Sequence, residues 1–283
     1  MLDLPDALCR PDAQLDGLRD TARTRVTGPE GARIHWTEWG QGPVLVMLHG
    51  AYGSWPHFVR NIAAFAQDHR VLIPDIPGYG LSDMPVGLPS MVGIGRQVAA
   101  GLDDLIGVDT PYRLVGFSFG GGVAGRLMVD HRGRQSHVLL AAPAGIASAH
   151  VPPMKSIRGR VGEDLADAIA FNLRSIMFAR DDTLGPQAMR IQHECASVAQ
   201  LRVEKVDWGP GLGAAVPGFA GHLMAVWGDA DSFTKPGEVP DRPGQIRAWN
   251  PAAETHVLPA TGHWLQYENA EGFNALLRDL LCR

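Results

Sequence analysis

Short, uninterrupted apolar runs recur along this chain, and stretches of helical length separate them. A run without polar alternation is typical of a strand that is covered on both faces, as in a parallel sheet. In chain order these runs are Val44–Leu48, Arg70–Pro74, Tyr112–Phe117, His137–Ala142, Leu223–Trp227 and Thr255–Leu258. Strands that alternate with helices predict an α/β fold, in which a mostly parallel central sheet carries helices on both faces.

The intervening stretches have the amphipathic pattern of helices that pack on a sheet. They are Phe58–Gln67, Met91–Ile106, Gly121–Asp130 and Ala270–Leu281. Two further strand-like segments, Thr24–Thr27 and Ile34–Trp39, flank a turn that begins Gly28-Pro29. This arrangement predicts a β-hairpin, which we expect at one edge of the sheet.

The regular alternation breaks between Pro143 and about Gly221. Two helix-like segments, Glu163–Ala179 and Pro186–Val203, dominate this region, and its ends are rich in proline and glycine. An insertion into a folded domain requires such loop-like ends. We therefore predict that residues 1–142 and 221–283 form the core and that residues 143–220 form an inserted helical cap.

Charge and composition exclude several classes of partner. The net charge of -5 gives no basic surface for nucleic acid or an anionic membrane. Three widely spaced cysteines suggest no disulfide framework, and the sequence offers neither a signal peptide nor a membrane span, so we expect a cytoplasmic protein. No metal-ligand spacing occurs, so no metal or other cofactor is predicted. The oligomeric state stays open, a homodimer included.

The sharpest motif is Gly116-Phe-Ser-Phe-Gly120, directly between a predicted strand and a predicted helix. A Gly-x-Ser-x-Gly in this position makes a strained turn that raises the serine hydroxyl above the sheet edge. The helix that follows directs its N-terminal N–H groups at that hydroxyl and favours developing negative charge there. We therefore predict that Ser118 is a nucleophile.

A serine nucleophile needs a base, and the base needs a carboxylate that fixes its tautomer. His263 lies in a loop after the last predicted strand, where sheets of this kind place their ligands. For the acid we select Asp231, which follows the strand Leu223–Trp227; Asp229 in the same turn is the alternative. The order nucleophile, acid, histidine is the one that this architecture uses.

Acyl transfer also needs donors for an oxyanion. One predicted donor is the backbone N–H of Phe119, immediately after the nucleophile. The second is the backbone N–H of Ala51, in the turn after the strand Val44–Leu48. Each donor is expected to contribute about 3 kcal/mol to the transition state.

Together these motifs resemble the α/β-hydrolase superfamily from about Val26 onward. The segment Pro74–Ser82 is similar to the Asp-x-Pro-Gly-x-Gly-x-Ser turn of that superfamily, and Leu48-His49-Gly50 resembles its oxyanion turn. Haloalkane dehalogenases look similar too, but their nucleophile is an aspartate. The resemblance implies a triad of Ser118, Asp231 and His263.

The C-terminal segment Gly262–Glu268 is similar to that of the meta-cleavage-product hydrolases, which split carbon–carbon bonds in vinylogous 1,5-diketones. In that subfamily a cap arginine and the tryptophan after the histidine bind substrate. The resemblance therefore implies such roles for Arg190 and Trp264. The chain departs from the subfamily pattern at Ala51–Ser54, where a Gly-Gly-Gly-Pro-Gly run is usual, and at Phe117 and Phe119, where Asn and Met are usual.

Because of these departures, we predict a serine esterase whose small to medium, hydrophobic substrate forms an acyl-enzyme on Ser118. The predicted substrate-binding residues are Tyr52, Trp55, Phe117, Arg190 and Trp264. Phe58 and Phe119 would add further aromatic surface. Two alternatives stay open: a carbon–carbon hydrolase of the meta-cleavage-product type, and a ligand-binding protein without catalytic activity on the same fold.

Overall fold

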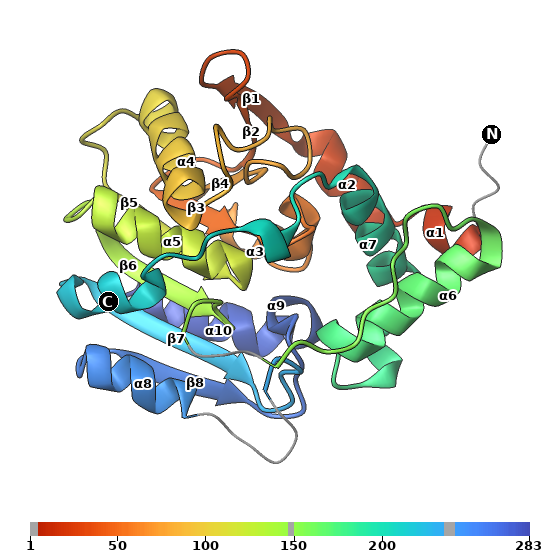
Figure 1. The fold of residues 1–283 in the computed structure, drawn as a ribbon. Coiled ribbons are helices and arrows are strands. Elements are labelled where there is room, and N and C mark those ends of the chain that lie inside the picture. Colours follow the sequence, from red (N-terminus) through yellow and green to blue (C-terminus); the bar gives the residue numbers. More distant parts are fainter. Residues whose placement is uncertain (1–4, 147–149, 235–240) are drawn as a thin grey trace.

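The computed structural model describes residues 5–146, 150–234 and 241–283, which form an eight-stranded sheet with helices around it (Figure 1). The strand order is β1-β2-β4-β3-β5-β6-β7-β8. Strands β3 to β8 run parallel, and β1 and β2 pair antiparallel at one edge. The strands are β1 Arg23–Thr27, β2 Ile34–Trp39, β3 Val44–Leu48, β4 Arg70–Pro74, β5 Tyr112–Phe117, β6 Gln135–Ala141, β7 His222–Gly228 and β8 Glu254–Leu258. The predicted α/β-hydrolase architecture, edge hairpin included, is confirmed.

The central strands are buried because both faces are covered. All five residues of β3 are buried, and β5, β6 and β7 are almost as completely enclosed. Helices α4 and α5 pack side by side on one face of the sheet, and α10 lies on the other (Figure 1). Among the described residues, the α-helices are α1 Asp6–Cys9, α2 Ala13–Thr21, α3 Ile62–Phe65, α4 Met91–Ile106, α5 Phe119–Asp130, α6 Gly162–Asn172, α7 Pro186–Val198, α8 Arg242–Trp249, α9 Leu265–Glu268 and α10 Ala270–Leu281.

One predicted helix, Phe58–Gln67, is much shorter in the structure. Only a 3-10 turn at Trp55–Phe58 and the four-residue α3 form there. Between them, the buried Asn61 side chain donates to the Gln266 carbonyl and to Asn274 on α10. These tertiary hydrogen bonds fix the chain direction at this point and override the helical pattern.

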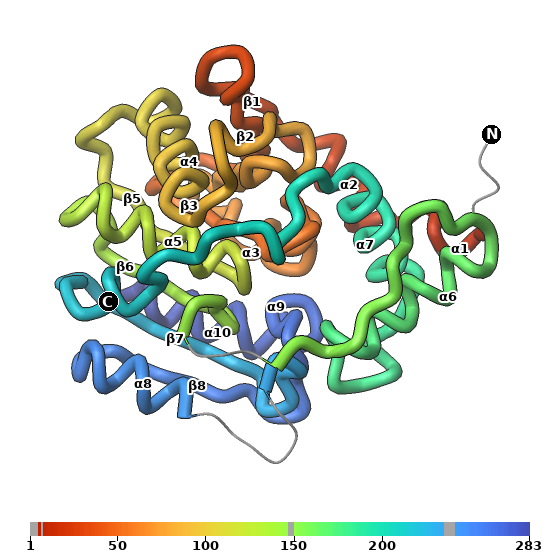
Figure 2. Tube along the Cα trace, viewed as in Figure 1, coloured from red at the N-terminus to blue at the C-terminus, as the bar shows by residue number. Residues whose placement is uncertain are grey.

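Between β6 and β7 the chain leaves the sheet, and we call residues 142–221 the helical excursion. Its helices α6 and α7 lie beyond the carboxyl ends of the parallel strands, as the continuous trace in Figure 2 shows. Helix α6 continues into a π-helical turn at Leu173–Met177, and α7 ends at Val198 because the amides of Gln200 and Leu201 donate to the Gly78 carbonyl.

The later part of the excursion returns to the core. Trp208 packs edge-on against Phe119, and Leu212 lies against Gly125 of α5. The treatment of residues 143–220 as a separate cap stays a prediction, and residues 147–149 within that range lie outside the described part. The first helices of the chain, α1 and α2, pack against the excursion at α7 (Figure 1).

Candidate active site

Ser118 occupies the junction of β5 and α5 in a backbone conformation that L-residues rarely adopt. Its φ is 51° and its ψ is -115°. Such strain costs of the order of 1–3 kcal/mol and persists only where the surroundings determine it fully. Here the Ser118 amide donates to the Ala141 carbonyl, and the Ser118 carbonyl accepts from Gly121 and Ala144, each at 2.9 Å. The turn therefore holds the hydroxyl in one position.

Two glycines make this turn possible by close approach. A Cβ on Gly120 would lie 2.3 Å from the Leu48 carbonyl oxygen, and one on Gly116 would lie 2.7 Å from the Gly120 carbonyl oxygen. Neither distance is sterically allowed, so the backbone doubles back only without side chains at these positions. The spacing of the Gly-x-Ser-x-Gly motif is thus a packing requirement.

His263 reaches Ser118 from the loop between β8 and α9. Its Nε2 lies 2.8 Å from the Ser118 Oγ, and its Nδ1 lies 3.1 Å from both carboxylate oxygens of Asp231. The carboxylate therefore fixes the proton on Nδ1, which leaves Nε2 to accept the proton of the serine. The structure brings together the three residues that the sequence proposed as a triad.

Asp231 is almost completely buried, with 2% of its side chain exposed. Burial alone would raise the pKa of Asp231, but His263, the amide of Phe233 and the guanidinium of Arg242 outweigh it and hold that pKa below its ordinary value. Arg242 lies 3.7 Å from the carboxylate. Asp229, the alternative acid, instead accepts a hydrogen bond from the Thr261 amide at 3.1 Å. It supports the loop that carries His263.

The predicted oxyanion donors lie on two segments that meet at the nucleophile. Phe119 is the first residue of α5, where a helix leaves its N–H groups without intrahelical acceptors. The turn that contains Ala51 is adjacent, because a Cβ on Gly50 would lie 3.3 Å from the Cβ of Ser118. The assignment of both amides to an oxyanion stays a prediction.

Aromatic side chains surround the triad. The Phe117 ring is fully buried, 5.2 Å from the His263 ring between centroids, and the Phe233 ring lies 4.5 Å from the same imidazole. Tyr52 and Trp55 are partly exposed and pack against Tyr79 and Trp39, respectively. Phe117 and Phe233 make the surroundings of the His263 imidazole apolar.

Two residues predicted to bind substrate, Arg190 and Trp264, make internal contacts in the structure. The Arg190 guanidinium donates to both oxygens of Asp16, at 2.7 and 3.1 Å, and its Nε donates to Glu194 at 2.8 Å. It therefore fastens α7 to α2. The Trp264 ring is fully buried between other rings, and its indole N–H donates to the His57 carbonyl at 2.9 Å. Both side chains thus have internal partners, and their roles in substrate binding stay predictions.

Three further polar residues are buried near the site: His49 and Asp75 lie in the motif segments Leu48–Gly50 and Pro74–Ser82, whereas His57 belongs to no motif. His49 is completely buried, which lowers its pKa to about 4, and its Nε2 accepts from the Ile76 amide. His57 is equally buried, and burial followed by the charges of His49 and His263 lowers its pKa well below the ordinary value. Asp75 accepts from Ser54 at 2.5 Å, and burial raises its pKa.

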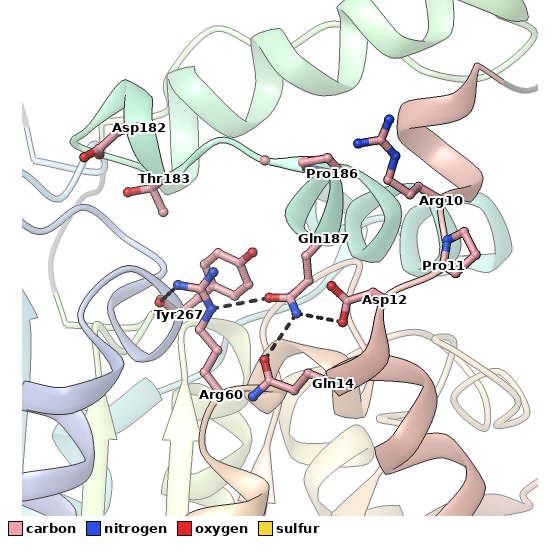
Figure 3. Close-up of a pocket in the computed structure, with 11 residues that line it drawn as sticks. Arg10, Pro11, Asp12, Gln14, Arg60, Asp182, Thr183, Pro186, Gln187 and Tyr267 are labelled. Atoms are coloured by element: carbon pink, nitrogen blue, oxygen red, sulfur yellow. Dashed lines mark hydrogen bonds between the residues drawn. The ribbon is translucent and has the colours of Figure 1, made fainter.

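A cavity of about 600 Å³ lies elsewhere, between the start of α7, α9 and the N-terminal segment (Figure 3). Gln187 crosses it and makes hydrogen bonds with Arg60, Asp12 and Gln14. Since Ser118 does not line this cavity, the cavity is separate from the triad.

Among residues 5–146, 150–234 and 241–283, no group of three or more His, Cys, Asp or Glu is arranged to hold a metal ion. Within those residues, no helix has the length and apolar character needed to cross a bilayer.

The chain is similar to known hydrolases over most of its length. The chain is 31% identical over 275 residues to a 2-hydroxy-6-oxo-6-phenylhexa-2,4-dienoate hydrolase of Burkholderia cepacia, which covers 90% of this chain and 93% of that protein. It is 32% identical to a 2-hydroxy-6-oxononadienedioate/2-hydroxy-6-oxononatrienedioate hydrolase of Paraburkholderia phymatum, with 90% of this chain and 93% of that protein covered.

Among solved structures, a carboxylesterase from Bacillus subtilis superposes with a TM-score of 0.77 at 18% identity, covering 95% of this chain and 96% of that one. A meta-cleavage product hydrolase superposes with a TM-score of 0.69 at 17% identity, covering 91% and 97%. Residues 45–276 match the Alpha/beta hydrolase family. The chain therefore belongs to the α/β-hydrolase family and is a hydrolase.

Proposed function

We propose that this protein hydrolyses carboxylic esters of small to medium, hydrophobic acids through an acyl-enzyme on Ser118. The observation that carries the proposal is the unbroken chain of contacts from the Ser118 Oγ through His263 to Asp231, at 2.8 and 3.1 Å. A pure binding protein has no physical need for this arrangement on a strained turn.

Each step follows from a group in place. His263 Nε2 takes the proton as the Ser118 Oγ attacks the ester carbonyl, and the buried carboxylate of Asp231 stabilises the imidazolium that forms. The amides of Ala51 and Phe119 are the proposed donors to the oxyanion. His263 then protonates the leaving alcohol, and a water molecule, activated by the same imidazole, releases the acid.

The preference for an apolar acid rests on the rings around the nucleophile. Phe117 and Phe119 flank Ser118 in the sequence, and both are buried in the aromatic surroundings of the triad. An apolar acyl group gains by leaving water for such surroundings, whereas a charged one loses its hydration. Arg190, the cationic side chain that the resemblance assigns to substrate binding, forms ion pairs with Asp16 and Glu194.

The test is hydrolysis of p-nitrophenyl butyrate by the wild type and by Ser118→Ala. We expect the variant to lose at least about 1,000-fold in kcat, because nucleophilic attack is removed. Ser136→Ala, an exposed serine at the start of β6, is the control and should keep wild-type activity. A fluorophosphonate should label Ser118. Undiminished turnover in Ser118→Ala would exclude the mechanism.

A second candidate is hydrolysis of a carbon–carbon bond, favoured by one observation. Relatives that are 31% and 32% identical over nearly the whole chain are named as dienoate hydrolases. Bleaching of yellow 2-hydroxy-6-oxo-6-phenylhexa-2,4-dienoate distinguishes the two candidates. Bleaching with a kcat/KM above that for p-nitrophenyl butyrate would replace the ester proposal with this one.

A further inference from the structure

Glu268, the last residue of α9, has a carboxylate with no exposed surface that gathers hydrogen bonds from several parts of the chain. It accepts from the amide of Ala179 at 3.1 Å, the amide of Arg180 at 2.9 Å and the hydroxyl of Thr183 at 3.1 Å. It also accepts from the amide of Gly262 at 2.5 Å. Three of these donors belong to the helical excursion, and the fourth immediately precedes His263.

The backbone around these bonds is closely packed. The Trp264 amide donates to the Met177 carbonyl at 2.9 Å. A Cβ on Gly262 would lie 2.7 Å from both the Met177 oxygen and the Ala179 nitrogen, so only glycine fits between the two segments. The loop that carries His263 therefore lies directly on residues 177–179 of the excursion.

The loop that carries the acid meets the same segment. Ser232, next to Asp231, donates through its hydroxyl to the Ile176 carbonyl at 2.6 Å. Residues 176–180 of the excursion thus lie against both the acid loop and the histidine loop. The Glu268 carboxylate connects the two segments directly, because its Oε2 accepts from Ala179 of the excursion and from Gly262 of the histidine loop.

Open space lies close to this contact. The cavity of about 600 Å³ is lined by Thr183 of the excursion and by Tyr267, the neighbour of Glu268 (Figure 3). Side-chain packing across that gap is therefore incomplete. Hydrogen bonds to a carboxylate are stronger than neutral ones, and here they hold the excursion together with the Phe178 ring, which stacks on Trp264 and Tyr267.

We propose that Glu268 is a positioning residue that ties the placement of the helical excursion to the placement of His263. Loss of a donor is costly for a buried carboxylate, because its desolvation is offset mainly by those hydrogen bonds, with the Arg180 guanidinium 3.9 Å away. Displacement of residues 179–183 therefore removes donors from Glu268 and releases the Gly262 amide. The imidazole then moves relative to Ser118, and a misplacement of about 1 Å costs about 100-fold in rate. The proposal rests on the proposed function in that Ser118 is taken as the nucleophile.

The experiment uses Glu268→Gln with Glu38→Gln as the matched control. A glutamine keeps the shape of Glu268 but replaces one carboxylate oxygen with an NH2 group. The hydrogen bonds that this oxygen accepts are therefore lost. Glu38 is also a buried carboxylate, 3% exposed and bonded to Arg23 and Arg70 on the far edge of the sheet. Its variant reports the general cost of removing a buried charge.

The readout is the second-order rate at which a fluorophosphonate labels Ser118, together with kcat and KM for p-nitrophenyl butyrate. For Glu268→Gln we expect labelling and kcat to fall about 10- to 100-fold, with KM changed by no more than about twofold. For Glu38→Gln we expect both rates within about twofold of wild type once circular dichroism shows it folded.

Wild-type labelling in Glu268→Gln, or an equal loss in Glu38→Gln, would overturn the coupling and leave the proposed function intact. Absence of Ser118 labelling in the wild type would overturn the proposed function and this proposal together. If Glu268→Gln does not fold, Thr183→Val removes one donor to the same carboxylate and should slow labelling about two- to fivefold. An unchanged rate in that variant would refute the coupling.

Discussion

At the residue scale, His263 depends on Asp231 for its tautomer as well as its orientation, because Nδ1 faces the carboxylate and Nε2 faces Ser118. In Asp231→Asn the side-chain NH2 can donate to Nδ1 of His263, which places the imidazole proton on Nε2. Nε2 then can no longer accept the proton of the Ser118 hydroxyl. We expect kcat to fall about 1,000- to 10,000-fold, with little change in KM.

Asp229→Asn is the natural comparison, since Asp229 accepts from the Thr261 amide and Asp231 is the carboxylate that faces His263. Its amide oxygen still accepts that bond, so we expect a loss of about tenfold or less. Steady-state kinetics of both variants on one ester settle the assignment. Equal losses in the two would mean that Asp231 is not the carboxylate of the triad.

The sequence was informative at this scale where chemistry requires a fixed spacing. Ser118 lies in such a spacing, and His263 follows the last strand. Arg190 does not, because its partner Asp16 lies 174 residues away in the chain and only the folded structure brings the two together. Glu268 was equally invisible as a functional residue, since all its donors except the Thr183 hydroxyl are backbone amides, which leave no trace in residue identity.

At the scale of elements, the buried strands were predictable and the short helices were not. β3 and β5 are enclosed on both faces, so their apolar runs mark them unambiguously. The segment around Asn61 has a helical pattern, but its direction depends on hydrogen bonds to Gln266 and Asn274 near the C-terminus. Local patterns contain no information about such partners.

The connection between α2 and α7 gives a prediction at this scale. Arg190→Ala removes the ion pairs that join Arg190 to Asp16 and Glu194, and its buried stem leaves a gap. We expect a lower urea midpoint of unfolding, while KM for an ester stays within about twofold of wild type, because the guanidinium is engaged by Asp16 and Glu194.

Equilibrium unfolding followed by fluorescence, with parallel kinetics, measures both quantities. Arg174→Ala is a suitable control, because the Arg174 side chain is 55% exposed and its ion pair with Asp181 is 3.4 Å long at the surface. It should change neither quantity. A large rise in KM for Arg190→Ala would return Arg190 to the substrate site.

At the scale of the whole molecule, buried imidazoles make the stability of the fold depend on pH. Burial lowers the pKa of His49 to about 4, whereas an unfolded histidine titrates near 6.5. Below pH 6.5 the unfolded chain binds a proton that the folded protein does not, so the free energy of unfolding falls as pH falls. The loss for His49 alone is about 2 kcal/mol by pH 5, and it levels off below pH 4.

Urea unfolding at pH 7.5 and at pH 5 measures this loss. His49→Gln should be less stable at pH 7.5 and should lose about 2 kcal/mol less on acidification, because the titrating group is gone. His57 adds to the wild-type loss in the same direction. His256→Gln, on the edge strand β8, should retain the full acid sensitivity. A wild-type protein equally stable at both pH values would contradict the prediction.

Because residues 176–180 lie against the loops that carry Asp231 and His263, this contact affects the design of chimeras that exchange the helical excursion between homologous enzymes. A chimera that takes its specificity helices from one parent and its triad from another would divide this contact, in which Ser232, Gly262 and Glu268 meet the exchanged backbone. Junctions placed at the ends of β6 and β7 would bring foreign carbonyls and amides to a native carboxylate. Transplants that carry the segment 228–234 and 261–268 along with the helices should retain turnover more often.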